Sequence, residues 1–272
     1  MCGLKRYDLN NKIGWITGAA SGLGRALAVE LDRRGMILVL IDKDRDGLAA
    51  LQSNLGESNR HATVCIDLTV EPAVLTGRLD ALEAPYRDID VLVNCAGYVT
   101  AGCLADVPFD GFRHNLDVNF SAPLVLIQHT INIMKQKKSG QIVNITSAMS
   151  RRGVPFFSAY CAAKAALNAL TDSIRCELSA DNINVMLVAP GTMATNIFHN
   201  AIVFGNVDPD KINFPGMRAP RITARKIARG LERKVSRITQ FSAAEVLFLI
   251  NIICPSVVDR IFRKTILDKI GK

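Results

Sequence analysis

The sequence predicts an α/β protein built on a doubly wound parallel sheet of about seven strands, with helices on both faces. Three observations support this class. Short apolar runs alternate along the chain with segments whose apolar residues recur at helical spacing. The first run ends in a glycine-rich turn that leads into a helix pattern. Polar residues suited to chemistry follow directly after the runs, where ligands bind in such sheets.

The elements follow in order along the chain. The apolar runs that we expect to be strands lie at 13–17, 36–41, 61–66, 90–94, 141–145 and 184–189. Helix patterns follow Ala26, Pro72, Ser121 and Ser158, and a basic helix is expected from Thr223 to Lys234. We expect one domain over residues 1–240 with a substrate lid at about 196–220, followed by an apolar and basic helical extension at 241–272.

Composition narrows the class of protein. A chain of 272 residues with 49% hydrophobic and 21% charged residues is typical of a globular domain with one core. The formal charge of +8 is concentrated after Lys211, but this region lacks the aromatic interleaving and motifs of a nucleic-acid binder. The 7 cysteines have no paired spacing, and several lie in apolar runs (Cys65, Cys95, Cys254), so we expect buried thiols in a reducing compartment and no metal site. The N-terminus lacks the apolar core of a signal peptide, and no run reaches the roughly 20 apolar residues of a spanning helix.

The glycine-rich turn after the first run predicts a dinucleotide site. Gly18, Gly22 and Gly24 permit a tight turn and let backbone N–H groups approach a pyrophosphate at the positive end of the following helix. The spacing is Gly-x-x-x-Gly-x-Gly, which fits the common Gly-x-Gly-x-x-Gly pattern only loosely, so a simple loop is the alternative. The strand–turn–helix context favours the cofactor.

Asp42, at the end of the second run, favours NAD over NADP. An acid about 20 residues beyond the glycines suits a hydrogen bond to the ribose diol, and the same carboxylate would repel a 2′-phosphate. Ser21 in the turn supplies no basic group for such a phosphate. Lys43 and Arg45 are the counterargument, because either has the reach to bind one.

Tyr160 and Lys164 lie four residues apart in a helix pattern, so their side chains share one face. A free phenol titrates near pH 10, but a cation held close favours the phenolate and lowers the pKa. The pair is therefore a candidate acid/base at neutral pH. Taken alone, this spacing also occurs by chance on exposed helices.

These motifs together resemble the short-chain dehydrogenase/reductase superfamily over residues 10–200. The resemblance rests on Thr17-Gly-Ala-Ala-Ser-Gly-Leu-Gly24, Asp67, Asn94-Cys-Ala-Gly97, Asn119, Ser147, Tyr160 with Lys164, and Pro190-Gly-Thr-Met-Ala-Thr195. It implies a Rossmann-type fold and an alcohol–ketone oxidoreductase. Cys95 departs from the family, which usually has a second Asn there; a small thiol should fit.

The resemblance also implies roles for single residues. Tyr160 would be the general acid/base, and Lys164 would lower its pKa, hold the nicotinamide ribose and start a proton relay. Ser147 would bind the substrate oxygen, and Asn119 would hold a water that links Lys164 to solvent. The implied cofactor-binding residues are Gly18, Ser21, Gly22, Leu23, Asp42, Asp67, Leu68, Asn94, Ala96, Gly97, Tyr160, Lys164, Pro190, Gly191, Thr192 and Thr195.

The last third of the chain bears on substrate and location. The lid carries Ile197, Phe198, Ile202, Val203, Phe204, Ile212, Phe214 and Met217, which predicts an apolar pocket. Arg151 and Arg152 are expected in a solvated loop, with contact to an anionic substrate as the alternative. The segment 246–270 is apolar on one side and basic on the other, which is typical of a helix at a membrane interface. An oligomer interface or an extra helix pair packed on the domain are the alternatives.

The sequence thus predicts an NAD(H)-dependent enzyme of lipid metabolism that interconverts an apolar alcohol and ketone. It would be cytoplasmic, or peripheral on a membrane, and a homodimer or homotetramer. One alternative is an NADPH-dependent reductase of 3-oxoacyl or 3-ketosphinganine-like substrates. Another is a binding protein that senses the cofactor ratio without turnover.

Overall fold

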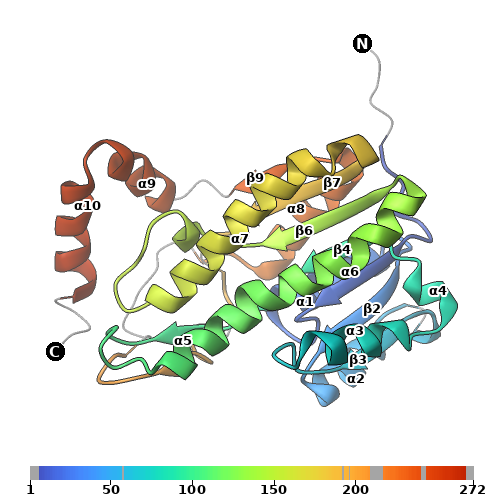
Figure 1. The fold of residues 1–272 in the computed structure, drawn as a ribbon, viewed down its shortest axis with the longest axis horizontal. Coiled ribbons are helices and arrows are strands. Elements are labelled where there is room, and N and C mark those ends of the chain that lie inside the picture. The colour runs from blue at the N-terminus through green and yellow to red at the C-terminus, as the bar shows by residue number, and fades with distance from the viewer. Residues whose placement is uncertain are drawn as a thin grey trace, which may run out of the picture.

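Seven parallel strands form the central sheet of the protein, in the order β3-β2-β1-β4-β6-β7-β9 (Figure 1). The computed structural model describes residues 6–56, 58–191, 193–195, 197–208, 217–239 and 243–267. The strands are β1 (Ile13–Thr17), β2 (Ile37–Asp42), β3 (Ala62–Cys65), β4 (Val91–Asn94), β6 (Gly140–Ile145), β7 (Ile183–Ala189) and β9 (Arg237–Thr239). A separate parallel pair joins β5 (Thr100–Ala101) to β8 (Ile202–Val203).

Helices cover both faces of this sheet, so the predicted doubly wound architecture is confirmed. One face packs against α1 (Gly22–Asp32), α2 (Arg45–Gln52) and α8 (Pro220–Arg233). The other packs against α3 (Pro72–Asp80), α6 (Ala122–Lys137) and α7 (Ser158–Glu177). The short α4 (Ala84–Arg87) lies near β2, and α5 (Phe109–Leu116) runs through a π-helical turn at Asp117–Ser121 into α6.

The inner strands are largely apolar because both faces of the sheet are covered. All five residues of β1 are buried, and successive side chains enter opposite layers. Ile16 packs in the layer of α1, and Trp15 packs in the layer of α3 and α6. This arrangement leaves no polar alternation along β1, in which Thr17 is the last residue.

The strand order reverses between β1 and β4, which pair with each other in parallel register. Chain connections leave β1 and β4 toward opposite sides of the sheet, which opens a crevice at their carboxyl ends. β6 is the next neighbour, with Asn94 opposite Asn144. The residues that follow these three strands are therefore brought together at one edge.

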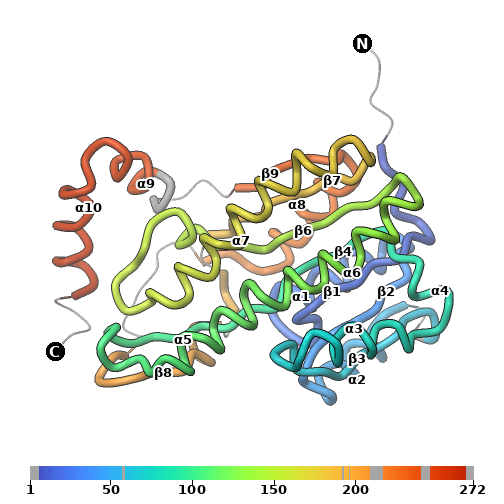
Figure 2. Tube along the Cα trace, viewed as in Figure 1, coloured from blue at the N-terminus to red at the C-terminus, as the bar shows by residue number. Residues whose placement is uncertain are grey.

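The extension forms a helical pair, α9 (Ala243–Ile253) and α10 (Pro255–Phe262), followed by a π-helical turn at Arg263–Leu267. Figure 2 shows the pair at one end of the molecule, the end that also carries α5 and β8. Pro255 begins α10, as expected of a residue that cannot continue α9. Within the described ranges, no helix has the length and apolar composition needed to cross a membrane.

The prediction of buried thiols is wrong for most of the cysteines that the structure describes. Cys161 is buried, Cys65 and Cys95 are half-buried, and Cys103, Cys176 and Cys254 are exposed, all six as free thiols. Apolar neighbours in the sequence are a poor guide at the ends of elements. Cys254, for example, lies at the junction of α9 and α10, where the chain turns at the surface.

Candidate active site

One large cavity lies at the carboxyl ends of the strands and contains most of the predicted site. Its volume of about 1380 Å³ exceeds the roughly 300–1,000 Å³ of a pocket for one small ligand, which leaves room for a cofactor and a substrate. The predicted residues that line it are Gly18, Ser21, Gly22, Leu23, Asp42, Asp67, Leu68, Ala96, Gly97, Ser147, Tyr160, Lys164, Pro190, Gly191 and Thr195. Asn94 and Asn119 are not among the lining residues, and Thr192 lies outside the described residues.

The glycine-rich turn leaves no space for a side chain at Gly18 or Gly24. Gly18 has φ +67°, and a Cβ there would lie 2.7 Å from the Cα of Ala96. A Cβ at Gly24 would lie 2.0 Å from the carbonyl oxygen of Gly18. The first turn of α1 lines the cavity. The side chain of Ser21 does not cap this turn, so its backbone N–H groups are not used by a side-chain cap. Exposed N–H groups at a helix N-terminus suit a pyrophosphate.

Asp42 is held at the end of β2 by two backbone N–H groups. Ala20 N–H donates to its Oδ2 at 3.0 Å, and Asp44 N–H donates to its Oδ1 at 3.1 Å. The carboxylate thus connects the glycine-rich turn to β2 and still has free lone pairs toward the cavity. Asp44 lines the same corner of the cavity, at the carboxyl ends of β2 and β3, and it caps α2 by accepting from Gly47 N–H.

Asp67, after β3, adds a further negative charge to the same corner. Burial alone would raise the pKa of Asp67, but hydrogen bonds from the N–H and hydroxyl of Thr69 and the charge of Lys43 lower it. Lys43 Nζ lies 3.9 Å from Asp67 Oδ2. Lys43 is therefore partly neutralised by a neighbouring carboxylate, and the corner as a whole is acidic.

Tyr160 and Lys164 meet on the buried face of α7, with 5% and 3% of their surfaces exposed. Lys164 Nζ lies 5.9 Å from the centroid of the Tyr160 ring and donates a hydrogen bond to the carbonyl of Ile145 at 3.0 Å. The Tyr160 phenol is hydrogen-bonded to Ser147. The three side chains that the sequence singled out around the reacting centre are therefore brought together.

The expected lowering of the Tyr160 pKa is wrong for this pocket. Burial raises the pKa of Tyr160 to about 12, and the hydrogen bond with Ser147 offsets only part of that. Burial also lowers the pKa of Lys164 to about 8. Desolvation penalises the charged form of both groups and is the largest cause of each shift. At neutral pH the phenol is protonated, and the lysine carries the positive charge.

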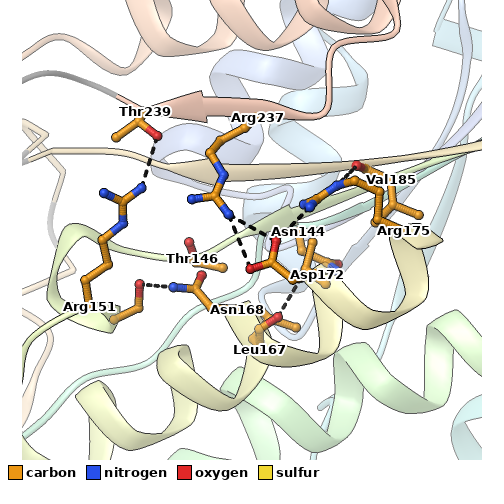
Figure 3. Close-up of polar contacts among 12 residues, drawn as sticks. Asn144, Thr146, Arg151, Leu167, Asn168, Asp172, Arg175, Val185, Arg237 and Thr239 are labelled. Atoms are coloured by element: carbon orange, nitrogen blue, oxygen red, sulfur yellow. Dashed lines mark hydrogen bonds and ion pairs between the residues drawn. The ribbon is translucent and has the colours of Figure 1, made fainter. Parts of the chain in front are cut away.

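The turn that carries Ser147 is fixed to α7 and β9 by polar contacts (Figure 3). Ser150 donates to the carbonyl of Ser147, and Asn168 on α7 donates to Ser150 Oγ at 2.6 Å. Arg151 contacts Thr239 Oγ1 on β9 at 3.5 Å. Ser147 Oγ itself accepts from Met149 N–H at 3.1 Å. The hydroxyl of Ser147 is thus held in place on the turn from which it contacts Tyr160.

Asn119 lies in the π-helical turn between α5 and α6 and is fully buried. Its amide nitrogen donates to the carbonyls of Tyr98 at 2.8 Å and Asn115 at 3.0 Å, and its oxygen accepts from Tyr98 N–H at 3.3 Å. A π-helical turn often marks a functional position. The side chain connects this turn to the segment after β4, and its role toward a water stays a prediction.

Asn94 joins the sheet to α7 and does not reach the cavity. Its amide donates to Asn144 Oδ1 at 2.8 Å, and Asn144 in turn donates to Thr171 Oγ1 at 2.9 Å. All three residues are buried. A polar chain in the core therefore fixes α7, and with it Tyr160, relative to β4 and β6.

The end of the cavity beside Tyr160 is apolar. Tyr160 packs in a buried cluster with Val99, Ala101, Met149, Phe156, Phe157, Cys161, Val207 and Ile266, against which Ile197, Phe198 and Phe262 also pack. Ile197 and Phe198 belong to the predicted lid, whereas Ile212 and Phe214 lie outside the described residues.

Sequence reasoning missed the part of the wall that comes from α9, α10 and the last turn. Leu247, Phe248, Ile261, Phe262, Thr265 and Ile266 line the cavity. Helical periodicity shows that this segment has an apolar side but gives no sign of what that side contacts. His114, Met149 and Met193 also line the cavity, and no motif marks them.

Arg151 and Arg152 lie in a loop, as expected, but they are half-buried and not fully solvated. Arg152 pairs with Asp259 on α10, and Arg151 lies over the ring of Phe248 on α9 at 5.2 Å. The partners lie about a hundred residues further along the chain, so local sequence could not reveal them.

Comparison with known proteins agrees with this geometry. The family model for short chain dehydrogenase matches residues 12–202. The chain belongs to the short-chain dehydrogenase/reductase family. Members of this family are NAD(P)-dependent oxidoreductases.

The chain is also similar to known relatives and to solved structures. Mouse dehydrogenase/reductase SDR family member 7B is 32% identical over 199 residues, which cover 71% of this chain and 61% of the mouse protein. This chain thus spans about three fifths of that relative. A short-chain dehydrogenase from Sphingobium yanoikuyae in complex with NADPH is 27% identical, with a TM-score of 0.76 over 91% of this chain and 95% of that one. A Burkholderia phymatum enzyme in complex with NAD shares the fold at 20% identity, with a TM-score of 0.82 over 92% of this chain and 96% of that one.

Proposed function

We propose that this protein interconverts a lipophilic secondary alcohol and its ketone, with NAD(H) as cofactor and Tyr160 as the acid/base. The observation that carries the proposal is the buried group of Tyr160, Lys164 and Ser147 at the apolar end of the cavity. The glycine-rich turn lines the other end of the same cavity. When bound, the nicotinamide supplies or accepts the hydride. The protein supplies position, proton transfer and the exclusion of water.

The proton step is assigned to Tyr160. Its phenol is protonated at neutral pH, so it donates to the oxygen of a ketone and receives the proton back in the reverse direction. The Ser147 hydroxyl donates to the same oxygen as negative charge develops on it. Lys164 keeps its ammonium against the Tyr160 ring, where it stabilises the phenolate that forms. After the ketone is reduced, Lys164 would return a proton to the phenolate, and Asn119 would hold the water that reprotonates Lys164.

The variant Tyr160→Phe tests this assignment. It removes the hydroxyl and keeps the ring in the apolar cluster, so NADH should bind as in the parent protein. We expect turnover to fall by at least about 100-fold, the usual range for a lost acid/base group. Turnover like that of the parent would overturn the assignment, and NADH binding without any turnover in the parent would favour a protein that only senses the cofactor.

We infer a preference for NAD(H) over NADP(H) from the charge around Asp42. Three carboxylates, those of Asp42, Asp44 and Asp67, line this corner, and the ammonium of Lys43 lies beside the last of them. A 2′-phosphate would add negative charge to an acidic site, whereas a ribose diol would donate hydrogen bonds to Asp42. The Sphingobium and Burkholderia structures contain NADPH and NAD respectively, so we infer the preference from these residues.

Fluorescence titration with NADH and NADPH tests the preference. The parent protein should bind NADH at least about tenfold more tightly, which corresponds to 1.4 kcal/mol. Asp42→Asn removes the charge and keeps an acceptor for the glycine-rich turn. It should therefore reduce or reverse the ratio of the NADPH Kd to the NADH Kd. Arg45→Ala, which removes an exposed cation from the same region, should leave the ratio unchanged. Tighter NADPH binding by the parent would mean that the enzyme is better tested as an NADPH-dependent ketone reductase.

We further propose that the outer face of α9 and α10 contacts an anionic membrane surface. Leu249, Ile252 and Ile253 are 57%, 65% and 84% exposed, although the same helix lines the cavity with Leu247 and Phe248. The neighbouring Arg260, Arg263 and Lys264 are exposed as well. An apolar face flanked by cations is typical of interfacial helices, and such a position would let an apolar substrate enter from the membrane.

Vesicle co-sedimentation tests the membrane contact. We expect binding to phosphatidylcholine vesicles that contain phosphatidylglycerol, weaker binding to phosphatidylcholine alone, and loss of binding in Leu249→Asp/Ile253→Asp. Val74→Asp is the matched control, because Val74 is 52% exposed on α3, away from this face. If the parent protein does not sediment with anionic vesicles, the face has another partner, such as a second copy in a homo-oligomer.

A further inference from the structure

The α9–α10 pair is held against the domain by the two arginines that follow Ser147. Arg152 forms an ion pair with Asp259 on α10 and lies over the ring of Phe262 at 5.7 Å. Arg151 lies over the ring of Phe248 on α9 and also contacts Thr239 at the end of β9. One short turn therefore contacts both helices of the pair, and the same turn presents Ser147 to Tyr160.

The inner side of the pair forms part of the apolar wall around Tyr160. Ile266 is 7% exposed and Val258 is fully buried. Ile266 and Phe262 pack in the cluster that contains Tyr160, Met149 and Phe157. The apolar part of a substrate whose oxygen reaches Tyr160 would therefore lie against α10 and the turn that follows it.

Individually weak polar contacts and apolar packing attach the pair to the domain. Among the residues that the structure describes, no backbone hydrogen bond joins 243–267 to the rest of the chain. The Arg152–Asp259 ion pair is partly solvated, with 29% and 60% of the two side chains exposed. Partly exposed ion pairs and cation–π contacts are individually weak. Such contacts can open and re-form without unfolding the domain.

We propose that the α9–α10 pair is a movable wall of the substrate cavity, with Arg152 as its latch and as a positioning residue for apolar substrates. The proposal rests on the function proposed above. It goes further by naming the wall of the cavity that distinguishes substrates by the length of their alkyl chain. When the latch is closed, Phe262 and Ile266 contact the chain that extends from the reacting carbon. When it is open, those contacts are lost and the cavity admits substrate or releases product.

Hydrogen–deuterium exchange tests the latch without any turnover. In Asp259→Asn and in Arg152→Ala, amides of 243–267 should exchange at least about fivefold faster than in the parent protein, while amides of β1 and α1 keep their rates. The double variant should exchange no faster than Arg152→Ala alone, because the two residues act through one contact. Arg225→Ala is the control, since it removes an exposed arginine beside Glu30 on the other side of the molecule. Equal exchange in parent and variants would overturn the latch.

Kinetics with 2-alkanones of increasing length tests the wall. In the parent protein, kcat/KM with NADH should rise from 2-butanone to 2-decanone, because each added methylene contacts the wall. The ratio of kcat/KM for the two ketones should fall about tenfold in Arg152→Ala and in Phe262→Ala. Arg152→Lys, which keeps the charge but not the planar stack, should restore part of it, and Arg225→Ala should not change it. If Arg152→Ala and Phe262→Ala keep the parent ratio of kcat/KM for the two ketones, the proposal that α10 forms a wall of the substrate site is refuted.

The two readouts separate this proposal from the proposed function. If the parent reduces none of the ketones although NADH binds, the substrate class is wrong, and the exchange experiment still decides whether the latch exists. If the ketones are reduced and the exchange rates do not respond to the variants, the proposed function stands and the movable wall is refuted.

Discussion

Replacing Lys164 by methionine should make the protein more stable at neutral pH while abolishing its activity. Burial lowers the pKa of Lys164 from 10.5 to about 8. At about 1.4 kcal/mol per pKa unit, the folded state pays roughly 3 kcal/mol at pH 7 to keep the ammonium. Methionine fills the same space without a charge. It leaves the carbonyl of Ile145 without its donor, which costs about 1–2 kcal/mol. A net gain of about 1–2 kcal/mol is therefore expected.

The gain should disappear as the pH rises. Between pH 8 and pH 10.5 the unfolded chain binds the lysine proton and the folded protein does not, so the stability of the parent increases through this window. The variant lacks that increase, and near pH 10 it should be the less stable of the two by about 1 kcal/mol.

Urea unfolding at several pH values between 6.5 and 10 measures both effects. Trp15 is the single tryptophan of the chain and is fully buried, so its fluorescence reports the loss of the core. Lys226→Met on the exposed side of α8 is the control and should shift the free energy of unfolding little at any pH. A difference between Lys164→Met and the parent that does not change with pH would refute the reasoning, because it would mean that the ammonium is not desolvated.

Three further substitutions test other parts of the structure. Gly18→Ala places a Cβ 2.7 Å from Ala96 at φ +67°, so it should cost at least about 2 kcal/mol of stability and abolish NADH binding in a fluorescence titration. An NADH affinity like that of the parent would contradict the assignment of the cofactor to the glycine-rich turn. Asn168→Leu removes the donor to Ser150, so kcat should fall about tenfold while the Kd of NADH stays the same; a rise in that Kd alone would point to a different role. Lys138 adopts a left-handed backbone conformation with φ 47° at the C-terminal cap of α6, which glycine adopts without strain. Lys138→Gly should therefore raise the free energy of unfolding by about 0.5–1 kcal/mol. A lower thermal midpoint in this variant would argue against the left-handed conformation.

Sequence patterns predicted the central sheet well because parallel strands are buried on both faces. Each of the six expected runs corresponds to a strand of the structure. The seventh strand, β9, was missed for a physical reason. It is the edge strand beside β7, it has only 3 residues, and it begins with Arg237, whose side chain pairs with Asp172 at the surface. A short edge strand with one neighbour needs no continuous apolar run.

The candidate site divides in the same way. Residues that act through backbone geometry or through spacing on one helix, such as Gly18 or the pair Tyr160 and Lys164, are visible in the sequence. The pKa values of that pair are not, because they depend on how much solvent the surrounding side chains exclude. The contact between Arg152 and Asp259 joins residues 107 positions apart. Only the folded chain shows that the extension and the turn after Ser147 belong to one cavity.

The site combines groups that are unfavourable to bury with a polar framework that holds them. A desolvated ammonium weakens the folded state, and it persists because its surroundings are fixed by several independent connections. The chain from Asn94 through Asn144 to Thr171 attaches α7 to the sheet, and the Ser150–Asn168 contact attaches the Ser147 turn to α7. Lys164 thus lies on a helix that cannot shift to relieve its own desolvation. Over the described residues 243–267, the polar contacts with the domain are a partly exposed ion pair and two cation–π contacts. Rigidity is therefore concentrated where the proton moves, and freedom is left where an apolar substrate must enter.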